Sequence, residues 1–180
     1  MEKDYKIGKG KIELKNGSIT RYNADALVCP NIPDLEMVAI PGGCQFAFFV
    51  EGGEEIFLEA SKIAERNGQQ PIGSAHLTTA GRLPAKYVIH SVGPHTSDKI
   101  MRESTKSVLE LVANEGLSSV GFPTLGTGLY GFPIDKAVDI MSDEFSDYLK
   151  ADNSIQRIGL VLYGADSYKT GQKILDAKFK

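Results

Sequence analysis

The chain has 180 residues, 42% of them hydrophobic and 24% charged, and its 20 Lys and Arg against 23 Asp and Glu leave a formal charge of −3. This composition excludes disordered, collagen-like and disulfide-scaffold proteins, and the length predicts a single domain over 1–180. The negative charge argues against non-specific binding to nucleic acid or to an anionic membrane, because both depend on basic patches. One basic stretch near the amino terminus is interpreted as a solvated tail: Lys3, Lys6, Lys9 and Lys11.

Neither a targeting segment nor a metal-binding pattern is recognised. The amino terminus lacks an apolar core of signal-peptide length, and the longest apolar run, 46–50, is too short to span a membrane. Cys29 and Cys44 are not in CxxC spacing, so no zinc or redox motif is indicated. We therefore expect a cytoplasmic protein with no metal and no cofactor.

Short β-branched runs alternate with longer segments of helical periodicity. Strands are predicted at Lys11–Leu14, Ala26–Cys29, Ala75–Ala80, Tyr87–Val92, Ser119–Pro123 and Arg157–Tyr163. Helices are predicted at Glu54–Asn67, Asp98–Asn114, Ile134–Leu149 and Ala165–Lys178, the last capped by Asp166 or Ser167. The segment Pro30–Gly53 is rich in proline and glycine and is interpreted as a long loop with at most one helical turn. This alternation predicts an α/β/α fold with a largely parallel sheet.

A glycine-rich segment follows the strand that ends at Pro123 and precedes a helix that begins near Pro133. Its glycines, Gly126, Gly128 and Gly131, allow backbone N–H groups to converge on an anion, and the helix start adds partial positive charge. Open α/β sheets bind ligands at such strand ends. A glycine-rich turn without a ligand is the alternative. The segment matches neither a Walker phosphate loop nor a Rossmann fingerprint.

Five segments in this order resemble the macrodomain family, the ADP-ribose-binding module. They are Gly17-Ser18-Ile19-Thr20, Asp25-Ala26-Leu27-Val28, Gly42-Gly43, Tyr87-Val88-Ile89-His90-Ser91-Val92-Gly93-Pro94 and Gly126-Thr127-Gly128-Leu129-Tyr130-Gly131. Taken alone, Ser18 and Thr20 are interpreted as caps of a short turn. The resemblance covers roughly 11–163 and implies a three-layer α/β/α fold with a mixed, largely parallel central sheet.

The resemblance also implies which residues bind the ligand. The loop residues Gly126, Thr127, Gly128 and Leu129 would wrap a diphosphate with their backbone amides, and Tyr130 would pack on the distal-ribose side. Gly42, Gly43 and Cys44 would form the opposite lip, and Ile19 would line the adenine pocket. Tyr163 either stacks on the base or is a half-buried aromatic at the edge of the core.

The chain departs from the family's pattern in three respects. Ser18 stands where an aspartate selects adenine, and a neutral hydroxyl is the weaker partner. Ile32 stands where an asparagine orients the distal ribose, so Asn31 would substitute only if the loop shifts by one residue. Gln45 stands where hydrolytic members carry an aspartate, and Tyr130 where another branch carries an acid. Asn31 and Gln45 are still expected among the ligand-binding residues. Catalytic residues therefore stay unknown, since no carboxylate base is evident.

These observations predict a protein that binds ADP-ribose or a related nucleotide, free or attached to an ADP-ribosylated macromolecule, with weak or no turnover. One alternative is a hydrolase that removes ADP-ribose from protein, nucleic acid or a small ester, with water activated by the substrate. Another is a partner-binding domain whose cleft is filled by Phe46 or Phe48, although core packing is the usual role of such residues. His90 is interpreted as structural, and His95 as a loop residue that approaches the ligand.

Overall fold

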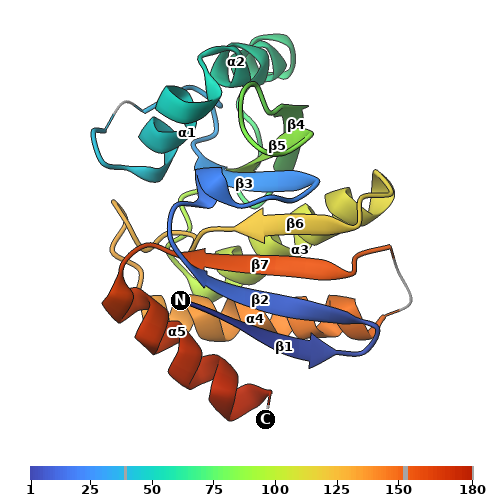
Figure 1. The fold of residues 1–180 in the computed structure, drawn as a ribbon. Helices are drawn as coiled ribbons and strands as arrows, with labels where there is room; N and C mark the ends of the chain where they lie inside the picture. Colours follow the sequence, from blue (N-terminus) through green and yellow to red (C-terminus); the bar gives the residue numbers. More distant parts are fainter. Residues whose placement is uncertain (39, 152–153, 180) are drawn as a thin grey trace.

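The computed structural model describes residues 1–38, 40–151 and 154–179, which build one seven-stranded sheet with helices on both faces (Figure 1). The strands are β1 (Glu2–Ile7), β2 (Gly10–Asn16), β3 (Ala26–Asn31), β4 (Ala75–Thr79), β5 (Tyr87–Val92), β6 (Ser119–Phe122) and β7 (Arg157–Leu162). Their order is β1-β2-β7-β6-β3-β5-β4. The inner pairs are parallel, whereas β1 and β4 run antiparallel to their neighbours at the two edges. The predicted mixed, largely parallel sheet is confirmed.

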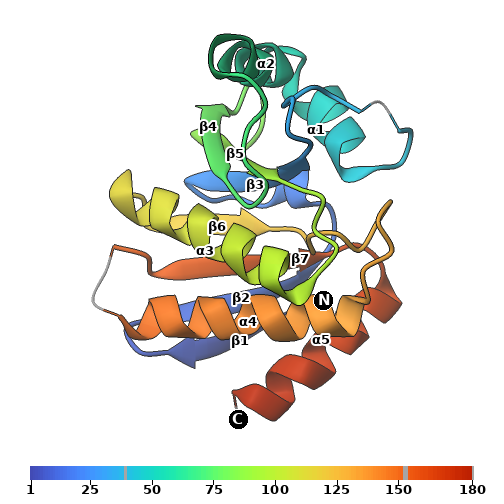
Figure 2. The ribbon, with the colours of Figure 1, turned by 180° about the vertical axis from the view of Figure 1, so that it is seen from behind.

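The helices divide between the two faces of the sheet. They are α1 (Cys44–Gly52), α2 (Glu55–Asn67), α3 (Asp98–Asn114), α4 (Ile134–Lys150) and α5 (Ala165–Lys178), with a 3-10 turn η1 (Ile19–Arg21). One core cluster joins Met101 of α3, Phe145 of α4 and Leu175 of α5 to the sheet. A second, smaller cluster joins Phe48 of α1 and Ile56 of α2 to the opposite face. Helices α3 and α4 lie behind the strands in Figure 1 and in front of them in Figure 2, which agrees with the predicted three layers.

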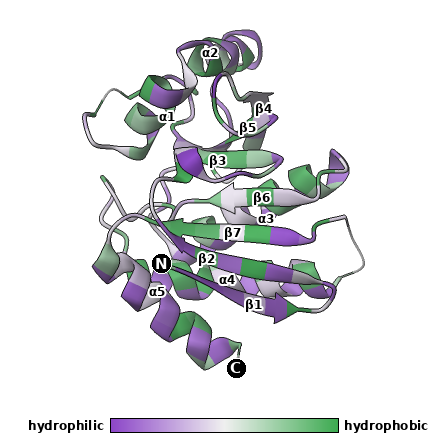
Figure 3. Ribbon diagram, in the orientation of Figure 1, coloured by the Kyte–Doolittle hydropathy of each residue, from purple (hydrophilic) through white to green (hydrophobic). Residues whose placement is uncertain are grey.

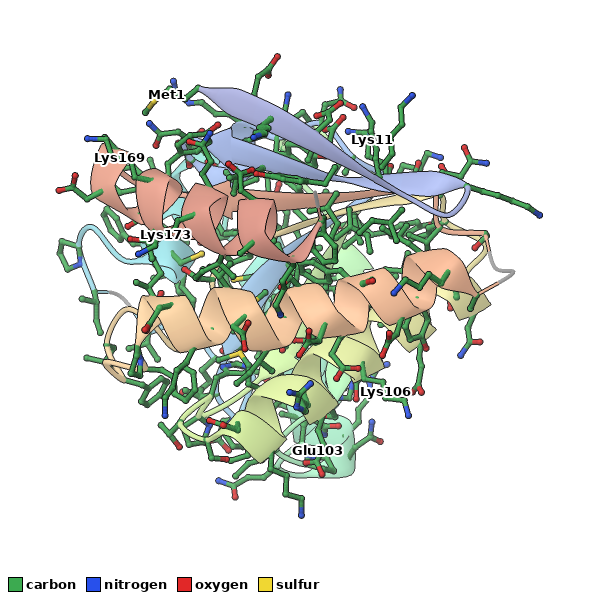
Figure 4. All side chains as sticks on the ribbon, turned by 90° about the horizontal axis from the view of Figure 1, so that it is seen from below. Met1, Lys11, Glu103, Lys106, Lys169 and Lys173 are labelled. Carbon is green, nitrogen blue, oxygen red and sulfur yellow. The ribbon has the colours of Figure 1, made fainter. Side chains whose placement is uncertain are left out.

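The central strands are apolar on both sides because helices or loops cover both of their faces. Along β7, Leu160 and Leu162 face the larger cluster, while Val161 between them faces the smaller one. Figure 3 shows β7 as hydrophobic over most of its length and the helices as striped. The outer faces of α3 and α5 carry charges, with Lys106 and Lys169 directed away from the sheet (Figure 4). None of the described helices is long and apolar enough to cross a membrane.

The amino-terminal residues form strand β1, so the interpretation as a solvated tail is wrong. Tyr5 and Ile7 are buried in the larger cluster, which holds the strand against the sheet. Two of the lysines are paired: Lys3 of β1 lies 2.6 Å from Asp176, and Lys11 of β2 lies 2.8 Å from Asp4 of β1. A strand with only two inward apolar residues has too little hydrophobic pattern to be recognised from the sequence.

The segment 30–53 contains a helix rather than a loop with at most one turn. Helix α1 begins after Gly43 and turns Phe48 completely into the core. Core packing is therefore confirmed for Phe48, and Phe49 packs partly against the same cluster. At α5 the predicted caps Asp166 and Ser167 are wrong, because the helix begins one residue after Gly164, whose φ is +97°.

Candidate functional site

Two adjoining cavities lie at the carboxyl ends of β3, β6 and β7. We call the larger one, of about 810 Å³, the wide cavity and the smaller one, of about 360 Å³, the narrow cavity. Both are lined by Gly42, Gly43, Cys44, Thr124 and Gly128. The two cavities therefore meet between the lip that precedes α1 and the glycine-rich loop after β6.

Every residue predicted to bind a ligand lines one of these cavities. Ser18, Ile19, Thr127 and Tyr163 line the wide cavity. Asn31, Gln45, Gly126, Leu129 and Tyr130 line the narrow one. Gly42, Gly43, Cys44 and Gly128 line both. The topology thus brings five separate segments of the chain to one cleft.

The wall of the wide cavity is held in place by Tyr22, directly after η1. Its ring lies on two glycines of the sheet, because a Cβ at Gly159 would stand 2.3 Å from Tyr22 Cζ and one at Gly121 2.6 Å from Tyr22 Cδ1. The Tyr22 hydroxyl donates to Glu13 at 2.7 Å and accepts from Arg157 at 3.0 Å. The glycines allow this close approach, and the polar contacts fix the turn that carries Ser18 and Ile19.

The side chain of Ser18, at the polar edge of the wide cavity, does not cap the turn as predicted. The Ser18 hydroxyl lies 2.5 Å from that of Thr20 and makes no capping bond to the backbone of η1. Tyr163 is 84% exposed, so the alternative of a half-buried core-edge aromatic is wrong. Its side chain stands at the rim of the cavity, with both a hydroxyl and an apolar ring available.

The glycine-rich loop is folded tightly on the segment that follows β5. Gly126 has a φ of +71°, and a Cβ there would stand 2.1 Å from the carbonyl oxygen of His95. Gly128 differs, because it has ordinary backbone angles and a Cβ added there would meet no atom within 4 Å, so it borders open space. The loop is closed by Phe132 N donating to Gly126 O and by Gly131 N donating to Gly128 O, both at 3.0 Å.

A chain of amide and imidazole hydrogen bonds lies behind the narrow cavity. Gln45 Nε2 donates to Pro30 O at 2.9 Å and to Asn31 Oδ1 at 2.7 Å, and Gln45 Oε1 accepts from Val38 N at 2.8 Å. Asn31 Oδ1 also accepts from Ile32 N at 2.8 Å. The lip is therefore tied through Gln45 to the end of β3.

The same chain continues into the core through His90. Because Asn31 Oδ1 already accepts two bonds, Asn31 Nδ2 must donate to His90 Nδ1 at 3.1 Å. His90 Nε2 then carries the proton and donates to Thr78 Oγ1 at 3.0 Å, whose hydroxyl donates to Thr79 O. Burial lowers the pKa of His90 to about 3, so the ring is neutral and structural, as predicted. Both amide atoms of Asn31 are thus engaged in this chain.

The narrow cavity offers little chemistry for proton transfer. Among its described lining residues there is no Asp, Glu, Lys or Arg. Burial raises the pKa of the Cys44 thiol to about 12, and that of Cys29 well above its ordinary value, so both stay protonated. Within the described ranges no group of His, Cys, Asp and Glu side chains is arranged to hold a metal ion.

The cleft is open rather than filled by phenylalanine. Phe48 is completely buried in the core, and Phe46 borders the wide cavity without closing it. A cleft filled by Phe46 or Phe48 would have favoured a partner-binding domain without a ligand, and neither side chain fills it.

Several residues that line the cavities were not expected from the sequence. Ile32, Val38 and Ile40 make the narrow cavity apolar, whereas His95, which was expected to approach a ligand, also forms part of its boundary. Arg21 and Glu51, 3.5 Å apart, stand at the edge of the wide cavity. The only sequence signal was the position of His95 directly after Gly93-Pro94.

Comparison with known proteins shows which family the chain resembles in sequence and in fold. A model of the Macro domain matches residues 34–141. An O-acetyl-ADP-ribose deacetylase of Pantoea vagans is 34% identical over 92% of this chain and 99% of its own length. The solved structure of an Oceanobacillus iheyensis macrodomain with ADP has a TM-score of 0.90 at 26% identity, covering 99% of this chain and 96% of the other. A Trypanosoma brucei macrodomain in complex with ADP-ribose has a TM-score of 0.81 at 29% identity, covering 91% and 68%.

Proposed function

This chain belongs to the macrodomain family, and we propose that it binds ADP-ribose or a closely related nucleoside diphosphate, with weak or no turnover. The observation that carries the proposal is the junction of the two cavities between Gly42, Gly43 and Gly128. A ligand with a diphosphate in its middle would place its nucleoside in the wide cavity and its distal group in the narrow one. Backbone N–H groups at the junction suit the diphosphate charge.

The absence of a carboxylate among the described residues of the narrow cavity supports binding over catalysis. Gln45 is neutral, and both of its amide atoms are engaged in hydrogen bonds to Pro30, Asn31 and Val38. An amide cannot remove a proton from water, so it cannot act as a general base. The same site would accept ADP-ribose attached to a macromolecule if the attachment point faces the open rim beside Leu129, which is 73% exposed.

A hydrolase is the second candidate, favoured by relatives that carry the name O-acetyl-ADP-ribose deacetylase. In this chain such a reaction would rely on the diphosphate and backbone amides to orient water, because the lining residues supply no carboxylate.

Calorimetric titration with ADP-ribose tests the proposal, together with the variant Gly128→Glu. Gly128 faces open space at the junction, so the new side chain fits the fold and places its charge where the diphosphate would lie. Like charges about 4 Å apart repel by about 4 kcal/mol at a protein surface, which predicts a loss of affinity of at least about a hundredfold. Gly126→Glu is a poorer choice, because its Cβ would collide with His95.

Gln156→Glu is the matched control, since it adds the same charge at an exposed position just before β7, at the opposite end of that strand from Tyr163. Retained affinity in this variant and lost affinity in Gly128→Glu would support the site. A wild-type protein that gives no heat and no thermal shift with ADP-ribose or ADP would refute it. Release of acetate from O-acetyl-ADP-ribose that is abolished by Gly128→Glu would favour the hydrolase.

A further inference from the structure

The narrow cavity presents apolar side chains to a ligand from three segments of the chain. Ile32 follows β3, Val38 and Ile40 precede α1, and we call these three side chains the aliphatic wall. Leu129 and Tyr130 of the glycine-rich loop line the same cavity. Ile40, Leu129 and Tyr130 remain exposed, although removing large apolar side chains from water is favourable. Exposed apolar side chains gathered around one cavity indicate a site for an apolar group.

The amide and imidazole groups of the same cavity are already engaged. Asn31 and Gln45 bond to each other and to the backbone. His95 Nε2 lies 3.1 Å from the hydroxyl of Ser91. His95 Nδ1 is buried and faces Gly93, where an added Cβ would stand 2.8 Å from that nitrogen. These side chains therefore offer few hydrogen bonds to a polar ligand.

Hydrogen-bonding groups lie instead where the two cavities meet. The hydroxyls of Thr124 and Thr127 are 2.8 Å apart, and Thr124 lines both cavities together with Gly43 and Gly128. A sugar next to the diphosphate would find these groups, and water, at the open junction. The aliphatic wall has no hydrogen-bonding side chain, so a hydroxyl held against it would lose its water without compensation.

We propose that the aliphatic wall binds an acyl chain longer than acetyl, attached to the distal sugar of the ligand, so that the protein prefers such an ester to ADP-ribose itself. This inference rests on the proposed function, because it takes the diphosphate to lie at the junction of the cavities. The sugar would stay near the junction, and the chain would extend from one of its hydroxyl oxygens along Val38 and Ile40. The cavity volume of about 360 Å³ lies within the range of about 300–1,000 Å³ usual for small-molecule sites.

The lack of charge in the cavity selects among the groups that a sugar hydroxyl can carry. Its described lining residues include no Lys or Arg that would neutralise an anion. A further phosphate, or an acyl chain that ends in a carboxylate, would lose water there without gaining a counter-ion. An alkyl chain loses no hydrogen bonds and gains from each methylene group that leaves water. The cavity therefore favours a neutral alkyl chain over an acidic chain of the same length.

Four ligands test this preference by calorimetric titration. They are ADP-ribose and three derivatives that carry an acetyl, butyryl or succinyl group on the distal ribose. An amide links each acyl group to the sugar, because an amide resists hydrolysis and turnover then cannot disturb the titration. Butyryl and succinyl have the same number of carbon atoms, but succinyl ends in a carboxylate. We expect butyryl to bind about tenfold more tightly than acetyl, at about threefold to fourfold for each buried methylene, and succinyl to bind no better than ADP-ribose.

Two variants locate the acyl chain in the cavity. Val38→Thr keeps the shape of the side chain and replaces a methyl group by a hydroxyl, and Ile40→Thr makes the wall more polar at an exposed position. Each should reduce the preference for butyryl-bearing ligand over ADP-ribose by about threefold, the worth of about one methyl group. Ile72→Thr is the matched control, because Ile72 is exposed to a similar degree as Ile40 and lines neither cavity. It should leave the preference unchanged, and thermal unfolding checks the fold of every variant.

Three results would overturn the inference. They are butyryl binding no more tightly than ADP-ribose in wild type, a gain with succinyl equal to that with butyryl, and a butyryl preference that survives in both Val38→Thr and Ile40→Thr. Failure of wild type to bind ADP, ADP-ribose or any of the derivatives would instead refute the proposed function, and the inference with it.

Discussion

The wide and the narrow cavity share one junction but are built on different principles. The wide cavity is bordered by charged and hydroxyl side chains, including Lys15, Arg21, Glu51 and Ser18, and its wall is set by an aromatic ring on two glycines. The narrow cavity is lined mainly by apolar side chains, and none of its described lining residues is Asp, Glu, Lys or Arg. The side-chain amides of Asn31 and Gln45 are engaged in a chain of hydrogen bonds. One cleft thus combines a compartment bordered by charged side chains with a second compartment whose described lining residues include no carboxylate and no cation.

Gln45→Glu should have the largest effect on stability, because it introduces a carboxylate into the narrow cavity, whose described lining residues include none. One carboxylate oxygen would face Pro30 O and Asn31 Oδ1, which are both acceptors. An unsatisfied buried charge of this kind should lower the free energy of unfolding by about 3 kcal/mol or more at pH 7. Chemical denaturation followed by circular dichroism measures the loss.

The same variant has a defined pH dependence. Burial beside acceptors raises the pKa of an introduced carboxyl, so the destabilisation is present at high pH and is relieved as pH falls through that pKa. The protonated Glu could donate where Gln45 Nε2 donates in the wild type. Unchanged stability at pH 7 would show that the lip rearranges easily and that the amide chain does not define it.

Asp25→Asn should have a smaller effect, confined to stability, because Asp25 lies at the end of the sheet opposite to both cavities. Its carboxylate accepts from Ser118 N at 3.0 Å and Ser119 N at 3.1 Å and pairs with Lys86 at 2.9 Å. Burial alone would raise the pKa of Asp25, but the bonds from Lys86, Ser118 and Ser119 hold it below its ordinary value.

A depressed pKa means that the Asp25 carboxylate stabilises the fold above about pH 4, the unfolded value, and that this contribution fades as pH falls through the folded value. We expect the variant to lose about 1–3 kcal/mol at pH 7, and the difference from wild type to shrink below about pH 4. Urea titrations at several pH values measure this, and ADP-ribose affinity should stay the same. A parallel loss of affinity would mean that the two ends of the sheet are coupled.

Ser18→Asp should have the smallest effect, and it concerns the wide cavity. The new carboxylate would accept a hydrogen bond from an adenine amino group, and a charge-assisted bond is roughly twice as strong as a neutral one. We expect affinity for ADP-ribose to rise by up to about tenfold, with no comparable gain for the inosine analogue, which lacks that amino group. Calorimetric titrations with both ligands measure the two gains. An equal gain in affinity for both would exclude a role for position 18 in selecting the base.

The fold was largely predictable because the central strands are continuous apolar runs. The bounds of β5, α3 and α5 were predicted as observed, and the remaining predicted elements differ by no more than two residues at either end. Strand β1 was missed because only Tyr5 and Ile7 face inward, and α1 because glycines flank a run without helical periodicity. These two elements depend on tertiary burial rather than on local pattern.

The lining of the cleft was predictable from motifs, whereas its hydrogen bonding was not. Gly128 and Tyr130 stand in a recognisable loop, and the structure places them at the cavities. The pairing of Asn31 with His90, 59 positions apart, is set by the alignment of β3 with β5 and leaves no trace in either local sequence. For the same reason the burial of His95 and its unpartnered nitrogen are visible only in three dimensions.

Strand β1 has a consequence for how copies of this protein meet. Its exposed positions carry Glu2, Lys3, Asp4 and Lys6, so the free edge of the sheet is densely charged and alternates in sign. Charged side chains on an edge strand oppose its pairing with a strand of another molecule, because their charges would lose water in the new interface. We expect this edge to resist fibril-like stacking even at high protein concentration, leaving the cleft at the far ends of the strands unobstructed.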